Sequence, residues 1–144
     1  MARVLVIDDE PDILLLCRVN LEHAGHEAIE AASGEHGLAL LREQRPDAVV
    51  LDLMLPTIDG FDVLKVLELE RASVDVPIVV LTAKSGEQDR RTSFEIGADE
   101  FIAKPFSPES LLDVLDELIA MSPRDRAAKR EAKFSGPADE GAGD

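Results

Sequence analysis

Several kinds of residue are scarce or missing in this chain, and each absence excludes a class of protein. There is no tryptophan or tyrosine, and the single cysteine, Cys17, has no partner for an internal disulfide. No apolar run approaches the roughly 20 residues that span a membrane, and nothing resembles a signal peptide. With 45% hydrophobic residues among 144, the composition is that of a folded domain. We therefore expect a soluble, cytoplasmic protein that does not associate with a membrane.

Positive charge is also scarce. The chain has 15 basic and 30 acidic residues, a net charge of −15, and residues 1–121 carry all of it because residues 122–144 hold five of each sign. An acidic domain repels phosphate backbones, so we expect no direct nucleic-acid binding by residues 1–121. The charge suits a metal ion or a basic protein partner instead.

The sequence does contain a regular alternation of strand-like and helix-like segments. Short apolar runs are separated by stretches with apolar residues at helical spacing, and proline or glycine marks many of the boundaries. This alternation predicts an α/β fold, with a parallel sheet covered by helices on both faces. The expected strands are residues 3–7, 26–31, 48–51, 78–81 and 100–103.

The three most apolar runs should be the central strands. This predicts a flavodoxin-like (βα)5 doubly wound parallel sheet with strand order 2-1-3-4-5. In that order, ligands bind at the carboxyl ends of strands one and three. Asp8 and Asp9 follow the first strand, Asp52 follows the third, and Thr82 follows the fourth. We predict that these four residues form a pocket.

The residue types in this pocket favour phosphoryl chemistry. Three carboxylates at one edge cannot all stay ionised without a cation, and oxygen ligands select a hard ion such as Mg²⁺. An aspartate in such a site can act as a nucleophile and form an aspartyl phosphate. Lys104, after the fifth strand, would neutralise the transferred group, and Thr82 would hydrogen-bond one of its oxygens.

Taken together, these motifs resemble the receiver domain of two-component response regulators. Each motif is weak alone, but they lie in the family's order and spacing across residues 1–121. The matching pieces are Asp8-Asp9, VVLD ending at Asp52, the loop LMLPTIDG, Thr82-Ala83, GADEF, and Lys104-Pro105-Phe106.

The resemblance implies a phosphoacceptor and a metal site. Asp52 would accept a phosphoryl group from a sensor histidine kinase or a phosphotransfer protein. Mg²⁺ would be bound directly by Asp9, through water by Asp8, and by Asp52 and the backbone carbonyl of Met54. The Lys104–Pro105 peptide bond would be cis.

The resemblance also implies a switch. Thr82 and Lys104 would contact the phosphoryl group, and Thr82 and Phe101 would be the switch residues. The surface of the fourth helix, fifth strand and last helix, within residues 87–121, would change and bind a downstream protein or form a weak homodimer. Val114 stands where the family's winged-helix transcription factors usually carry an arginine, so we favour a protein partner or weak dimer over that dimer type.

Other interpretations remain at this point. Haloacid-dehalogenase-type phosphatases also use an aspartate nucleophile and Mg²⁺, but they need a second aspartate two residues later, where this chain has Met54. A degenerate receiver would only bind partners and would not need the intact acidic set. A receiver catalyses only its own phosphorylation and dephosphorylation, so we expect no other enzyme activity. Three of these residues also have simpler structural interpretations. Thr82 could be a loop residue and Phe101 a core residue. Glu10 could be an acidic residue of a first helical turn, with at most an accessory role at the metal.

The end of the chain differs from the rest. Alternating charges predict a further helix over residues 124–133. The glycine- and alanine-rich stretch 135–144 predicts a mobile end. We interpret residues 122–144 as a charged, mostly flexible tail, which is either a linker to an output domain or the end of a single-domain regulator.

Overall fold

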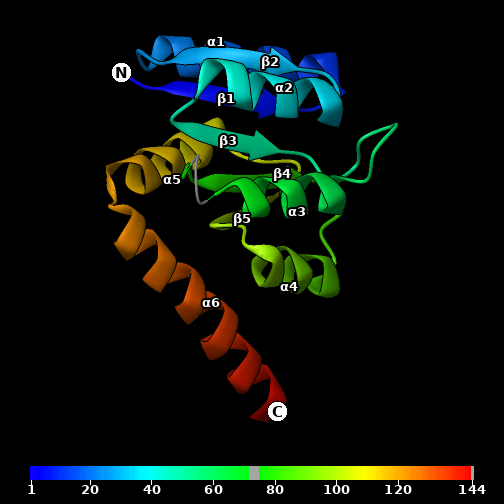
Figure 1. Cartoon of the computed structure of the whole chain (residues 1–144), viewed down its shortest axis with the longest axis vertical. Coiled ribbons are helices and arrows are strands. Elements are labelled where there is room, and N and C mark those ends of the chain that lie inside the picture. The colour runs from blue at the N-terminus through cyan, green and yellow to red at the C-terminus, as the bar shows by residue number, and fades with distance from the viewer. Residues whose placement is uncertain (72–74, 144) are drawn as a thin grey trace.

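The computed structural model describes residues 1–71 and 75–143, with side chains described as far as residue 133. Strands and helices alternate along the chain (Figure 1). The strands are β1 (Arg3–Ile7), β2 (Glu27–Ala31), β3 (Ala48–Leu51), β4 (Ile78–Thr82) and β5 (Glu100–Ala103). The helices are α1 (Pro11–His23), α2 (Gly34–Gln44), α3 (Gly60–Glu70), α4 (Glu87–Ile96), α5 (Pro108–Ala120) and α6 (Pro123–Gly143).

The strands form one parallel sheet in the order β2-β1-β3-β4-β5, which confirms the predicted flavodoxin-like (βα)5 fold. Ile7, the last residue of β1, pairs with Ala31 on one side and Leu51 on the other. The carboxyl ends of β1 and β3 are therefore level. Asp8 and Asp52, the next residue along each strand, emerge side by side at the switch point.

The sheet separates two apolar cores because successive strand residues point to opposite faces. Along β1, Leu5 belongs to the core under α2, α3 and α4, whereas Val6 belongs to the core under α1 and α5. β3 and β4 alternate in the same way. Every residue of these two strands is buried, as expected for central strands of a doubly wound sheet.

Local sequence signals fix the helix starts. Ser33 Oγ accepts a hydrogen bond from the His36 N–H at 3.1 Å and caps α2, and Asp59 caps α3 by accepting from the Phe61 N–H at 2.8 Å. Pro11 and Pro108 occupy the first turns of α1 and α5, where a missing N–H costs nothing. Within the described part of the chain, no helix combines the length and apolar character needed to cross a membrane.

The C-terminal segment differs from the prediction. The sequence predicted a helix only over residues 124–133, whereas α6 runs from Pro123 to Gly143, and the predicted flexibility of residues 122–144 stays a prediction. Ser122 starts this helix by accepting a hydrogen bond from the Asp125 N–H at 3.0 Å, and basic side chains as far as Lys133 attach it to the domain. Asp144, the last residue of the predicted tail, lies outside the described residues.

Candidate functional site

Two buried carboxylates form the centre of the site. Asp8 and Asp52 are each only 2% exposed. Their backbone neighbours fix both side chains in the same way, because Asp8 Oδ1 accepts from the Glu10 N–H at 2.9 Å and Asp52 Oδ1 accepts from the Met54 N–H at 2.9 Å. One oxygen of each carboxylate is thus held by the chain that follows it. The other oxygen, Oδ2, is left to face its neighbours.

Lys104 joins these carboxylates across the sheet edge. Its Nζ donates to Asp8 Oδ2 at 2.8 Å, to Asp52 Oδ2 at 3.1 Å and to Glu10 Oε1 at 2.8 Å. An ammonium has three protons, so these three acceptors use all of them. The Lys104 backbone N–H donates to the Thr82 carbonyl at 2.9 Å, which ties the residue to the end of β4. The Lys104–Pro105 peptide bond is cis.

The electrostatics follow from this burial. Desolvation raises the pKa of Asp8, and the hydrogen bond from Lys104 acts in the opposite direction. For Lys104, burial alone would lower the pKa, but the hydrogen bonds to Asp8, Glu10 and Asp52 outweigh burial and raise it. The lysine therefore stays charged at neutral pH. It supplies the cation that a buried carboxylate pair requires.

The carboxylates that could hold a metal ion are not all the ones that the sequence indicated. Asp8, Glu10 and Asp52 each place an oxygen within 4.8 Å of the others, and all three donors are hard oxygen ligands. Asp9 lies outside this group of three and is exposed. Sequence reasoning gave Glu10 no more than an accessory role. The available signal was its place directly after the acidic pair, at the start of α1.

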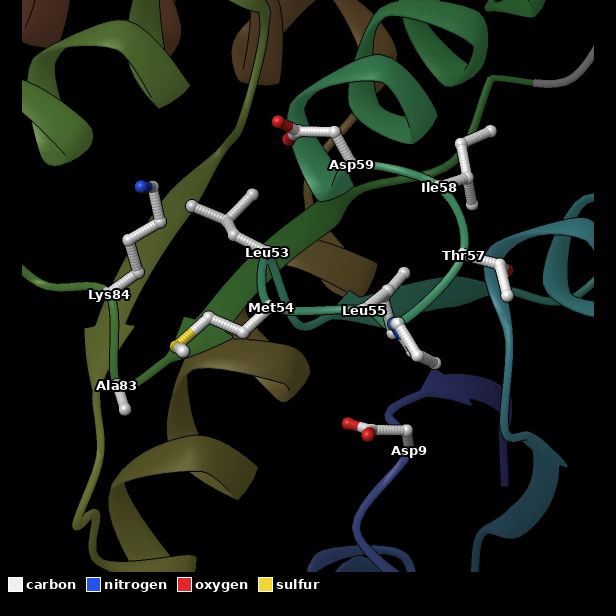
Figure 2. Close-up of a pocket in the computed structure, with 10 residues that line it drawn as sticks. Asp9, Leu53, Met54, Leu55, Thr57, Ile58, Asp59, Ala83 and Lys84 are labelled. Atoms are coloured by element: carbon white, nitrogen blue, oxygen red, sulfur yellow. The ribbon is translucent and has the colours of Figure 1, made fainter.

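Asp9 instead lines a cavity of about 700 Å³ beside the carboxylates, below the loop that joins β3 to α3. Figure 2 shows Asp9 and Lys84 on opposite sides of this cavity, with Met54 between them. The Met54 side chain is 56% exposed. The remaining lining residues are Leu53, Leu55, Pro56, Thr57, Ile58, Asp59 and Ala83. A molecule in this cavity would contact Asp9 and the loop that follows Asp52.

Gly60 determines the shape of the loop over this cavity. A Cβ at this position would lie 2.2 Å from the Leu53 Cα, and the Gly60 N–H donates to the Leu53 carbonyl at 3.1 Å. The loop therefore folds back on its own beginning, and only a residue without a side chain permits that approach. This contact holds the chain that follows Asp52 in place.

The two predicted switch residues lie on the neighbouring strands β4 and β5. Thr82 is the last residue of β4 and is fully buried, and its Oγ1 accepts from the Lys84 N–H at 3.1 Å. Phe101 is partly buried against the core under α2, α3 and α4. The register pairs Thr82 with Ala103 and Val80 with Phe101, so both switch residues belong to the same pair of strands.

Comparison with known proteins identifies the family. The model of the response regulator receiver domain matches residues 4–116. The chain is 41% identical to the DNA-binding dual master transcriptional regulator RpaA of Synechocystis sp. over 134 residues, which cover 93% of this chain and 56% of the relative. It is 42% identical to the alkaline phosphatase synthesis transcriptional regulatory protein PhoP of Bacillus subtilis over 109 residues, 76% of this chain and 45% of that protein. The chain thus spans about half the length of these curated relatives.

Solved structures agree with this assignment. The chemotaxis protein CheY4 of Vibrio cholerae has a TM-score of 0.76 at 31% identity, covering 82% of this chain and 98% of that one. The beryllofluoride-activated N-terminal receiver domain of Klebsiella pneumoniae RstA also has a TM-score of 0.76, at 27% identity. The match covers 83% of this chain and 99% of the RstA chain. The chain belongs to the response regulator receiver domain family of two-component signalling proteins.

Proposed function

We propose that this domain is a phosphorylation-dependent switch in which Asp52 accepts a phosphoryl group from a histidine kinase or a phosphotransfer protein. The observation that carries the proposal is the position of Asp52, which is buried at the switch point with one oxygen fixed by the Met54 N–H and the other bonded to Lys104. Asp52 Oδ2 attacks phosphorus and forms the O–P bond. The P–N bond of the donor phosphohistidine breaks, and its electron pair returns to the imidazole.

The other site residues take roles consistent with their positions. Lys104 pairs with an oxygen of the transferred group, and Thr82 turns its hydroxyl from the Lys84 N–H toward another. Asp8 and Asp9 would hold Mg²⁺ together with Asp52 and the Met54 carbonyl, with Asp9 turning inward from the cavity that it lines. Glu10, which has an oxygen within 4.8 Å of Asp8 and Asp52, would be available as a further ligand. When bound, the metal neutralises charge on the transferred group. The acidic, all-oxygen donor set supports this choice of ion.

The kinase contact is proposed for the outer side of α1. Leu15, Leu16 and Val19 are exposed apolar residues on this helix, which begins directly after the acidic edge. Exposed Met54 lies over the cavity at the same edge. A helical partner that buried these apolar side chains would place its phosphohistidine at the cavity mouth. The acidic domain itself would not bind nucleic acid.

The test is incubation with a small phosphodonor and Mg²⁺, followed by intact-mass measurement. We expect one added phosphoryl group in the wild type, none in Asp52→Asn, and none when a chelator removes the metal. Asp62→Asn, on the exposed face of α3, is the matched control and should label like the wild type. Full labelling of Asp52→Asn would refute the assignment. Continuous release of phosphate would favour the phosphatase alternative.

A further inference from the structure

The first part of α6 has the opposite charge to the domain it contacts. Residues 122–133 contain five basic and two acidic residues, a net charge of +3, whereas residues 1–121 carry −15. Helix α5 contains no lysine or arginine at all, and four of its residues are acidic. The charge distribution therefore favours attachment of α6 to the acidic side of the domain.

The contacts of α6 fall on α4, β5 and α5 together. Lys133 lies over the Phe94 ring of α4, with Nζ 5.3 Å from the ring centre, and forms an ion pair with Glu100 of β5. Lys129 pairs with Glu117 of α5 at 3.2 Å. One helix thus touches all three elements of the α4–β5–α5 surface, the surface proposed to transmit the phosphorylation signal.

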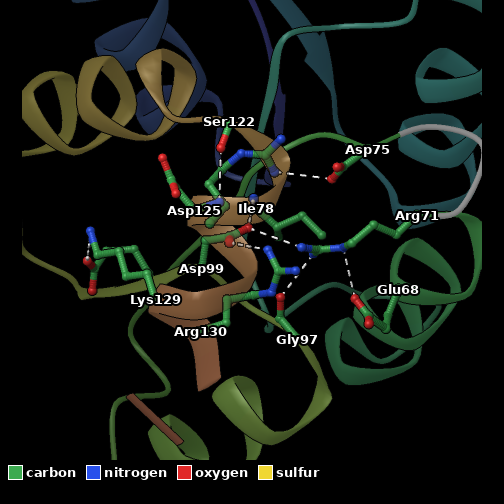
Figure 3. Close-up of polar contacts among 12 residues, drawn as sticks. Glu68, Arg71, Asp75, Ile78, Gly97, Asp99, Ser122, Asp125, Lys129 and Arg130 are labelled. Carbon is green, nitrogen blue, oxygen red and sulfur yellow. Dashed lines mark hydrogen bonds and ion pairs between the residues drawn. The ribbon is translucent and has the colours of Figure 1, made fainter. Parts of the chain in front are cut away.

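A buried network fixes this attachment (Figure 3). Asp99 is 1% exposed, and its Oδ1 accepts from Arg130 Nη1 at 2.7 Å. Its Oδ2 accepts from the Ile78 N–H at 2.8 Å and contacts Arg71 Nη1 at 3.4 Å, which ties α6 to the start of β4 and the end of α3. Because Asp99 is buried and binds two guanidinium groups, the contact of Arg130 differs from an exposed surface ion pair.

Closer to the start of α6, Arg126 adds a second anchor. Its side chain is 5% exposed and pairs with Asp75 at 3.2 Å. Arg126 and Arg130 lie four residues apart, so they project from the same face of the helix. Lys129 and Lys133 extend the basic face toward α5 and β5.

We propose that α6 occupies the α4–β5–α5 surface in cis, so that any partner of this surface must displace a basic helix. The contacts described above are sufficient to place α6 on this surface. Its meaning for signalling rests on the proposed function, because the covered surface is the one that phosphorylation would change. A competing partner would present its own basic residues to Glu100 and Glu117, the carboxylates that α6 neutralises.

The test is carbodiimide footprinting of carboxylates in the full chain, read by peptide mass. In the wild type, α6 should protect Asp99, which is 1% exposed, and Glu100, whose side chain is 18% exposed. In Arg130→Glu, which places a carboxylate against Asp99, labelling of both should rise about fivefold as α6 is released. Arg124→Glu makes the same change of charge at an exposed position of α6, with no ion-pair partner among the described side chains, and should label like the wild type.

A charge exchange provides the second measurement. Lys133→Glu should raise labelling of buried Asp99, the partner of Arg130, and adding Glu100→Lys should restore its protection. Equal labelling in Arg130→Glu, Arg124→Glu and the wild type would overturn the proposal, as would failure of the exchange to restore protection. Neither readout uses phosphoryl chemistry, so loss of the proposed phosphorylation at Asp52 would leave this result standing.

Discussion

Removing the Lys104 ammonium gives the sharpest test of the site. In Lys104→Met the side chain keeps its length and apolar stem but loses its charge. Asp8 and Asp52 would then be buried together without a cation. Loss of one partner from a buried ion pair costs about 3–5 kcal/mol, and because Glu10 is exposed and water can reach this edge, we expect the low end, about 3 kcal/mol at pH 7.5.

The stability lost in Lys104→Met should depend on pH, and the direction of this dependence follows from the pKa of Asp8. Burial raises the folded-state pKa of Asp8 above 3.8, so its contribution to stability is present at low pH and is lost as the pH rises through the folded-state pKa. Without the hydrogen bond from Lys104, that pKa rises further. The difference in unfolding free energy between wild type and variant should therefore grow from acid toward neutral pH. Lys104 has a raised pKa and stays charged throughout this range, so it adds no slope of its own.

The assay is urea unfolding followed by circular dichroism, because the chain has no tryptophan or tyrosine. A cost of about 3 kcal/mol lowers the midpoint by about 1.5 M urea at neutral pH. Added Mg²⁺ should recover part of the loss. Lys65→Met removes an exposed lysine and should change the midpoint little. If Lys104→Met matched the wild type at pH 7.5, or if its deficit shrank with rising pH, the described charge arrangement would be wrong.

Three further outcomes are expected. Gly60→Ala should destabilise the domain by about 1–3 kcal/mol in the same urea assay, because its Cβ meets the backbone of Leu53, whereas Gly86→Ala meets only a side-chain atom at 3.3 Å and should be tolerated. The pKa of buried Cys17 is raised to about 12, so the thiol should resist a thiol reagent at pH 8 until urea unfolds the chain; rapid labelling of the folded protein would contradict its burial. Apolar Met54 cannot orient a water, so the aspartyl phosphate should decay slowly and Met54→Asn should accelerate decay; fast decay in the wild type that the substitution leaves unchanged would refute this.

The sequence was sufficient to predict the order of the strands in the sheet, because the central and edge strands differ clearly in apolar character. Residues 48–51 and 78–81 are short, continuous apolar runs rich in β-branched residues, a pattern typical of strands buried on both faces. Placing them at the centre leaves few topologies with right-handed crossovers. The approach of Asp8 to Asp52 then follows from the fold, because parallel strands bring their carboxyl ends to one edge.

The arrangement within the site could not be derived in the same way. Whether Asp9 or Glu10 turns toward Asp52 depends on the backbone path between β1 and α1. There the Glu10 N–H bonds to Asp8, and the Glu10 side chain reaches Lys104. The sequence shows three adjacent acids but not the direction in which each points. The partner of Thr82 is equally local, since its hydroxyl bonds to a backbone N–H two residues later.

The attachment of α6 to the domain could not be derived from the sequence for a different reason. Local charge alternation indicated a helix over residues 124–133, but the strength of its attachment depends on residues far away in the sequence. Asp99 and Asp75 belong to other elements and receive Arg130 and Arg126 only once the domain has folded. Tertiary contacts of this kind stabilise a helix beyond its intrinsic propensity.

The two separate cores make the phenylalanines a natural set of spectroscopic probes. The chain has five, and with no tyrosine or tryptophan, fluorine-labelled phenylalanine gives a sparse NMR spectrum. Phe61, Phe94 and Phe101 pack on the core under α2, α3 and α4, whereas Phe106 packs on the core under α1 and α5. A signal from one side of the sheet can therefore be distinguished from a signal on the other. Rearrangement of the α3–α4 side alone would move three resonances and leave that of Phe106 in place.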